Sequence, residues 1–175
     1  MNFKVWALMQ GKLLPDTDEE ILRNLNCRKW DNQKAFDSMK FKVDYQKEKF
    51  PIKFTDNMFN LMNCGGLYIY GRDKNLRPIV ICDIKKLMEN KDLFGSNSSD
   101  LINVCLFMLE WMETFMFVEG RVENFLLIVD CKGIGVFSAP YLIFKQVMNV
   151  IQEYAKGKIK ATFCLNTEVG FGMIW

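Results

Sequence analysis

The chain contains no histidine anywhere in its 175 residues. This absence excludes Ser-His and Cys-His catalytic arrangements, histidine as a general acid or base, and every zinc site with an imidazole ligand. Any catalysis would have to rely on Cys, Lys, Asp and Glu. We therefore expect that the protein is not an enzyme and has no catalytic residue, metal or cofactor.

Long runs of one charge sign are also missing. The 23 Lys and Arg residues are mixed along the chain with 21 Asp and Glu residues, which leaves a net charge of +2. Nucleic-acid binders need clustered Lys and Arg, so this balance argues against a nucleic acid as partner. It permits a weak attraction to anionic membrane surfaces.

No two cysteines have the C-x-x-C spacing of redox and zinc motifs. We interpret the six as buried, reduced thiols, which favours the cytosol. They are Cys27, Cys64, Cys82, Cys105, Cys131 and Cys164. The apolar patch at residues 5–9 is broken by Gln10, Gly11 and Lys12, so it is too short for a signal peptide. We expect a cytoplasmic protein with peripheral membrane contact.

A charge-free membrane span is absent as well. The most apolar stretch, residues 101–118, carries Glu110 and Glu113 inside it. An acid at mid-span costs about 2.5–3.5 kcal/mol on an insertion scale. The stretch is therefore predicted to be a buried amphipathic helix.

Large apolar side chains are abundant instead. Aromatic residues make up 14% of the chain, with 15 Phe and 11 Met. Such side chains fill a core, and they also line apolar cavities. Trp111, Met112, Phe115 and Met116 form one such cluster, for which core packing and a pocket wall are both open interpretations.

The first part of the chain predicts two helices. Thr17 and Glu20 form a capping box for a helix over about residues 17–28. Asp31 is an N-cap for a second helix, which ends near residue 49, before Pro51. The segment that follows Pro51, rich in Asn and small residues around 63–66, is predicted to be loose.

The middle of the chain predicts a hairpin and a long helix. Residues 67–70 and 79–84 have the composition of strands, and residues 71–78 have that of a turn, so the pair is predicted to be antiparallel. Residues 90–100 predict a polar surface loop. The helix of residues 101–118 follows this loop.

The last part predicts two parallel strands. Residues 125–130 form a continuous apolar strand, typical of a sheet covered on both faces. After a loop at 132–137, Ser138 and Pro140 predict the start of a helix that runs to about residue 156. Residues 161–165 predict a strand joined to the first by a right-handed crossover, and residues 166–172 a turn into a further helix. The fold class is α/β, a mixed β-sheet with flanking helices after a small N-terminal helical unit.

Features near residue 130 carry weak chemical signals. Gly133, Gly135 and Ser138 match G-x-G-x-x-G only in part, because Ser138 replaces the third glycine. Asp130 ends a strand, where Mg²⁺ ligands occur, but no second acid stands beside it, and pairing with Lys132 or a helix N-cap is the preferred role. Cys131 has no histidine or resolving cysteine nearby. A nucleotide- or metal-dependent enzyme remains an alternative.

Four segments occur in an order known from one family. Residues 18–31 with Lys34-Ala35 are similar to a preface of the form LLRFLRARKFD…KA, and residues 73–80 to D-x-x-GRPV. Residues 125–134 are similar to IVDLKGI, and residues 152–154, 161–166 and 170–171 to Q-x-YPER…INAPFGF. Together they resemble the CRAL-TRIO lipid-binding family, of the phosphatidylinositol/phosphatidylcholine transfer type.

The resemblance implies a sheet that forms the floor of an apolar pocket, closed by a mobile helix. It implies that a phospholipid or other hydrophobic ligand is held there for exchange at membranes. Strand alternation and helix facing place eight side chains at this pocket: Ile79, Ile81, Trp111, Phe115, Leu127, Val129, Phe163 and Leu165. Tyr154 and Lys156 complete the expected lipid site, with Lys156 available to a phosphate.

Two departures from the family pattern modify these expectations. Lys156 and Gly157 replace the Glu-Arg pair that follows Tyr-Pro in members that bind phosphatidylinositol, so the usual inositol recognition is not expected. The family also continues past the position of Phe171 with helices and a strand. We therefore expect a helical preface at residues 1–60 and, at 61–175, a lipid-binding domain without its C-terminal part.

The missing part leaves two further possibilities. A protein partner could cover the open C-terminal side of the domain. Alternatively, the chain is a degenerate interaction module that kept the fold and lost the ligand cavity.

Overall fold

The computed structural model describes residues 3–11, 17–134 and 141–167, and for Tyr141 the backbone alone. The chain divides into two compact units. The first, called here the helical unit, comprises Met1–Pro51 and Gln152–Gly157, and the second, called the sheet unit, comprises Ile52–Ile151 and Lys158–Trp175. Each unit is described by itself.

The helical unit contains α1 (Phe3–Met9), α2 (Asp18–Cys27) and α3 (Asn32–Lys49). The Thr17 hydroxyl accepts from the backbone N–H of Glu20 at 3.4 Å, and the Asp31 carboxylate accepts from that of Lys34 at 3.0 Å. Both predicted N-caps are thus confirmed, because each side chain satisfies a donor that a helix start leaves unpaired. Helix α1 was not predicted.

The core of the helical unit is a small apolar cluster. Its buried members are Phe3, Ile21, Leu25, Ala35 and Met39. Trp6 and Phe36 pack against it, and the Trp6 ring stacks on Phe3 with centroids 5.6 Å apart.

The sheet unit begins with α4 (Asp56–Asn63), a helix within the segment after Pro51 that was predicted to be loose; only residues 64–66 of that segment form a turn. Thr55 caps this helix through Met58 N at 3.1 Å, and Met58 and Leu61 are fully buried. The predicted hairpin is present as β1 (Leu67–Arg72) and β2 (Pro78–Asp83), which pair antiparallel with a bulge between Ile69 and Gly71.

Three short helices follow β2, and the last two of them occupy the region predicted to be a polar loop. They are α5 (Ile84–Glu89), η1 (Lys91–Phe94) and η2 (Ser96–Ser98). Leu87 and Phe94 are buried, so this segment contributes to the core. The prediction that residues 90–100 form a surface loop is therefore wrong, because these residues include two short helices and Phe94 is buried. The polar composition of the segment did not show that Phe94 faces inward.

The long apolar helix is α6 (Ser99–Phe115), and seven of its side chains are buried. Strand β3 (Phe125–Asp130) matches the prediction residue for residue. Helix α7 (Tyr141–Tyr154) and strand β4 (Ile159–Leu165) follow, and β4 pairs parallel with β3, as predicted. Residues 135–140 and 168–175, where a helix cap and a final turn were expected, lie outside the described residues.

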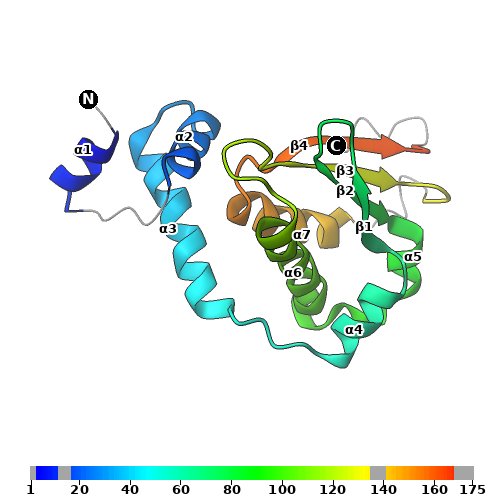
Figure 1. The fold of residues 1–175 in the computed structure, drawn as a ribbon. Coiled ribbons are helices and arrows are strands. Elements are labelled where there is room, and N and C mark those ends of the chain that lie inside the picture. Colours follow the sequence, from blue (N-terminus) through cyan, green and yellow to red (C-terminus); the bar gives the residue numbers. More distant parts are fainter. Residues whose placement is uncertain (1–2, 12–16, 135–140, 168–175) are drawn as a thin grey trace. The chain divides into compact units, whose positions relative to one another are not determined.

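The sheet has the order β1-β2-β3-β4, with β2, β3 and β4 parallel and β1 antiparallel to β2. Helix α6 and the first turns of α7 lie along one side of it (Figure 1). A mixed sheet with flanking helices is thus confirmed. Among the described residues, no helix combines the length and the apolar character needed to cross a bilayer.

Candidate functional site

One face of the sheet, called here the open face, carries apolar side chains in aligned rows. Residues paired on neighbouring strands point to the same side of a sheet. The pairings align Tyr68, Ile81, Ile128 and Phe163 in one row, and Ile79, Leu126 and Ala161 in the next. These seven positions are half-buried or exposed, and Phe163 keeps 50% of its surface in contact with solvent.

The opposite face, called here the covered face, is closed by helices. Its rows contain Val80 with Leu127, and Cys82 with Val129 and Cys164. Val80, Cys82 and Val129 are buried, and the thiol of Cys105 on α6 lies near that of Cys82. Leu127 and Val129, expected at the lipid site, therefore point away from Ile79 and Ile81.

The open face brings together four of the expected site residues: Ile79, Ile81, Phe163 and Leu165. Leu165 pairs with Asp130 at the end of the sheet and is 48% exposed. The expectation did not include Tyr68, Leu126 or Ile128. The sequence indicates these residues only through the alternation of side chains along each strand. Alternation within one strand does not tell which residues of the neighbouring strand lie on the same face.

Trp111 and Phe115 lie in a row of aromatic rings along α6. The rings of Phe54, Phe107, Trp111 and Phe115 follow one another with centroid separations of 4.9, 6.3 and 4.5 Å. Trp111 is 48% exposed and Phe115 is 64% exposed. The structure thus assigns these two residues to a helix surface and not to the open face of the sheet.

Tyr154 and Lys156 belong to the helical unit. The Tyr154 ring is almost fully buried against Tyr45 and Phe50, with the Lys42 ammonium 5.8 Å from its centre. Lys156 donates to the carboxylate of Glu153 at 2.8 Å. Glu153 also accepts from Arg28 at 2.6 Å. These residues hold the segment 152–157 within its unit.

A buried ion pair connects α6 to the start of β4. Lys158 Nζ donates to Glu113 Oε1 at 2.5 Å and lies 5.6 Å from the centre of the Phe117 ring. Lys158 is buried, with 5% of its surface exposed. Glu113, unexplained within so apolar a helix, thus faces a lysine 45 positions away in the sequence.

Asp130 makes local hydrogen bonds at the end of β3. Its Oδ1 accepts from the Asn166 amide at 2.7 Å and from the backbone N–H of Lys132 at 2.9 Å, and these bonds lower the pKa of Asp130. Asp83 is its neighbour on β2 and caps α5 through Lys86 N. No group of three or more potential metal ligands occurs among the described residues.

The thiols of the covered face are predicted to resist alkylation. Burial raises the pKa of Cys105 to about 12 and that of Cys131 to about 11, and it raises the pKa of Cys82 as well. At pH 8 a pKa near 11 leaves roughly one thiolate in a thousand, and the thiolate is the reactive form. In the native protein, iodoacetamide should modify the exposed Cys27 first. Peptide mass mapping checks this order, and labelling of Cys82 as fast as Cys27 would contradict it.

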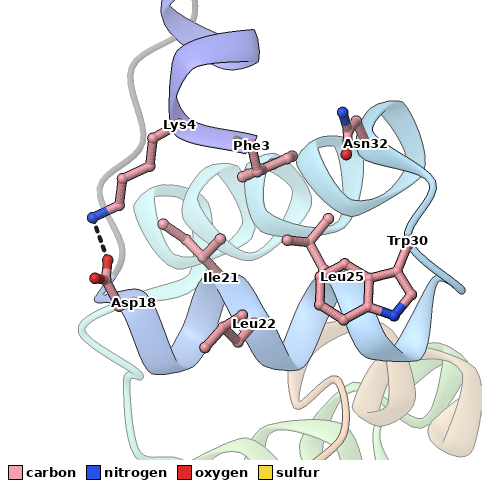
Figure 2. Close-up of a pocket in the computed structure, with 8 residues that line it drawn as sticks. All are labelled: Phe3, Lys4, Asp18, Ile21, Leu22, Leu25, Trp30 and Asn32. Atoms are coloured by element: carbon pink, nitrogen blue, oxygen red, sulfur yellow. Dashed lines mark ion pairs between the residues drawn. The ribbon is translucent and has the colours of Figure 1, made fainter. Parts of the chain in front are cut away.

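The helical unit contains a half-open pocket of about 350 Å³ between α1 and α2 (Figure 2). Phe3, Ile21 and Leu25 form its apolar floor, and Leu22 and Trp30 flank it. Polar groups mark its ends: the ion pair between Lys4 and Asp18 on one side, and Asn32 on the other.

The fold is similar to that of a solved structure, and the sequence matches a family model. The crystal structure of Sfh5 superposes with a TM-score of 0.66 over 91% of this chain, at 14% sequence identity. The chain spans 60% of the length of that structure. No curated protein sequence matches this chain. A family model described as the CRAL/TRIO domain matches residues 62–175, which is more than half of the sequence, and the chain therefore belongs to the CRAL/TRIO domain family.

Proposed function

We propose that this chain binds a phospholipid or another hydrophobic molecule on the open face of its sheet. The CRAL/TRIO family is one of lipid-binding and lipid-transfer proteins rather than enzymes. The proposal rests on five apolar side chains that share this face and are not fully buried. They are Ile81, Ile128 and Phe163 in one row and Ile79 and Leu126 in the next.

The chemistry of a lipid carrier requires such a surface. Moving a two-chain lipid into water exposes about thirty methylenes at about 0.8 kcal/mol each. A carrier must replace the bilayer with an equally apolar environment, and it makes or breaks no covalent bond. We propose that a cytoplasmic protein with peripheral membrane contact meets these needs. It extracts the lipid from one membrane and presents it at another without chemical change.

Headgroup recognition is proposed to differ from that of phosphatidylinositol carriers. The Lys156 ammonium is bound to Glu153, and its side chain is only 16% exposed. A lysine neutralised in this way offers little attraction to a phosphate. We therefore propose that selectivity rests on the apolar part of the ligand.

Phe163→Glu tests the proposal. Phe163 is half exposed, so the substitution costs the fold little, but it puts a carboxylate where acyl chains would lie. A charge in an apolar membrane environment costs about 2.5–3.5 kcal/mol, so lipid loading should fall at least about tenfold. Loading is measured by native mass spectrometry after incubation with lipid delivered from ethanol.

Phe59→Glu is the matched control. Phe59 lies on α4 of the same unit, is 63% exposed, and has no place on the sheet. It should load lipid like the unmodified protein. Absence of lipid from the unmodified protein, or equal loading by both variants, would argue against the open face as the lipid site.

A further inference from the structure

The pocket of the helical unit has the size and the lining of a small-molecule site. Its volume of about 350 Å³ lies at the lower end of the range of roughly 300–1,000 Å³ in which proteins hold small ligands, and well above the ~150 Å³ of a cavity that accepts benzene. Phe3, Ile21 and Leu25, which form its floor, are buried members of the apolar core of this unit. A lipid with about thirty methylenes is too large for it.

Two large side chains at the rim of the pocket remain in contact with water. Leu22 is 53% exposed and Trp30 is 63% exposed, and both line the pocket (Figure 2). The backbone fixes Trp30 there, because its N–H donates to the Leu25 carbonyl at 2.8 Å and its φ is +63°, which is rare for a bulky residue. A ligand in the pocket would cover part of both rim side chains, and burial of apolar area favours binding.

The charged residues of the pocket favour a neutral ligand. Lys4 and Asp18 lie at one end and form an ion pair with each other, so neither brings an unmatched charge to the cavity (Figure 2). Burying an ionised group against an apolar floor without a partner of opposite charge is costly. An anionic or cationic ligand should therefore bind poorly here.

Asn32 supplies a hydrogen-bonding group at the other end of the pocket. Its side chain is partly buried, and its amide has no hydrogen-bond partner among the residues that the structure describes. An amide side chain both donates and accepts hydrogen bonds, as a hydroxyl group does. Small-molecule sites combine a mainly apolar lining with a few polar groups that fix the orientation of the ligand, and Asn32 fits this role.

We propose that this pocket binds a small neutral molecule with an aromatic ring and a hydroxyl group. The ring lies on the apolar floor beside Trp30, and the hydroxyl group lies at Asn32. A rigid ring suits the site better than an alkyl chain, because it loses little conformational freedom on binding and aromatic pairs add stabilisation beyond the area that they bury. The pocket shares no residue with the open face of the sheet, so this inference does not depend on the proposed function.

The test uses the full chain with 2-naphthol as the neutral probe and 2-naphthoate as its charged counterpart. Ligand-observed NMR and isothermal titration calorimetry measure binding. We expect 2-naphthol to bind saturably at one site. We expect 2-naphthoate to bind at least about tenfold more weakly, because its carboxylate finds no unpaired cation in the pocket.

Variants locate the probe. Leu22→Glu puts a carboxylate at the rim and should weaken the binding of 2-naphthol about tenfold. Leu8→Glu is the matched control: Leu8 is 67% exposed on α1 and does not line the pocket, so this variant should bind like the unmodified protein. Asn32→Ala should weaken 2-naphthol about threefold to tenfold, the value of one hydrogen bond, and leave naphthalene, which lacks the hydroxyl group, unchanged. Far-UV circular dichroism checks that each variant is folded.

Four results would overturn the proposal: no saturable binding of 2-naphthol, equally tight binding of 2-naphthoate, undiminished binding by Leu22→Glu, or an equal loss of 2-naphthol and naphthalene in Asn32→Ala. Phe163→Glu separates this proposal from the proposed function. It should bind 2-naphthol like the unmodified protein, whatever its effect on lipid loading. Loss of the probe in this variant would assign 2-naphthol to the open face and would contradict the pocket as its site.

Discussion

Replacing Glu113 by Leu should lower the free energy of unfolding by about 3–5 kcal/mol, because it removes the carboxylate that is hydrogen-bonded to the buried Lys158 ammonium. The Lys158 side chain is 7% exposed, and the hydrogen bond to Glu113 is short. A leucine side chain at position 113 suits α6, because most residues of this helix are apolar. The main effect measured is therefore the loss of the ion pair with Lys158. Urea unfolding followed by far-UV circular dichroism, with the slope checked for constancy, gives the value.

The control removes both charges. Glu113→Leu with Lys158→Met replaces a buried ion pair by apolar groups of similar size, which is often close to neutral. The double variant should therefore recover most of the stability that Glu113→Leu loses. Equal losses in the single and double variants would show that packing, and not charge, decides the effect.

Tyr154→Ala should also cost about 3–5 kcal/mol, the usual range for truncating a buried aromatic ring. The ring is 1% exposed and is packed between Phe50, with which it is nearly parallel, and Tyr45. The substitution removes the aromatic anchor that holds residues 152–157 in the helical unit. Thermal unfolding monitored by near-UV circular dichroism reports the loss of aromatic packing.

Tyr154→Phe separates the ring from the hydroxyl. It retains every ring contact, so its cost should be about 1 kcal/mol or less, the net value of one hydrogen bond. If Phe at this position destabilises as much as Ala, the hydroxyl carries the effect and the stacking described above is secondary.

Local signals predicted the elements well where capping and periodicity agreed. Asp31 fixed the start of α3, and the apolar run at residues 125–130 gave β3 without error. Helix α4 was missed although Thr55 is a good N-cap and Met58 and Leu61 have helical spacing. The Asn and Gly residues at its end and just after it are typical of a loop, and they led to the prediction of a loose segment.

The pairing register of the strands decides which side chains share the open face, and no single strand's sequence specifies that register. In β2 the odd-numbered residues Ile79 and Ile81 lie on the open face, whereas in β3 the even-numbered Leu126 and Ile128 lie there. A shift of one residue moves a whole strand's side chains to the other face. Leu127 and Val129 were therefore expected at the site but lie on the covered face.

The sequence by itself determined the mixed α/β class, the positions of most helices and strands, and the resemblance that names the family, because caps, turns and apolar periods act over a few residues. The tertiary structure alone decided which apolar side chains share the open face, why Glu113 stands in an apolar helix, and that Tyr154 packs on Phe50. Each of these contacts joins residues distant in the chain, and strand register and helix packing set them.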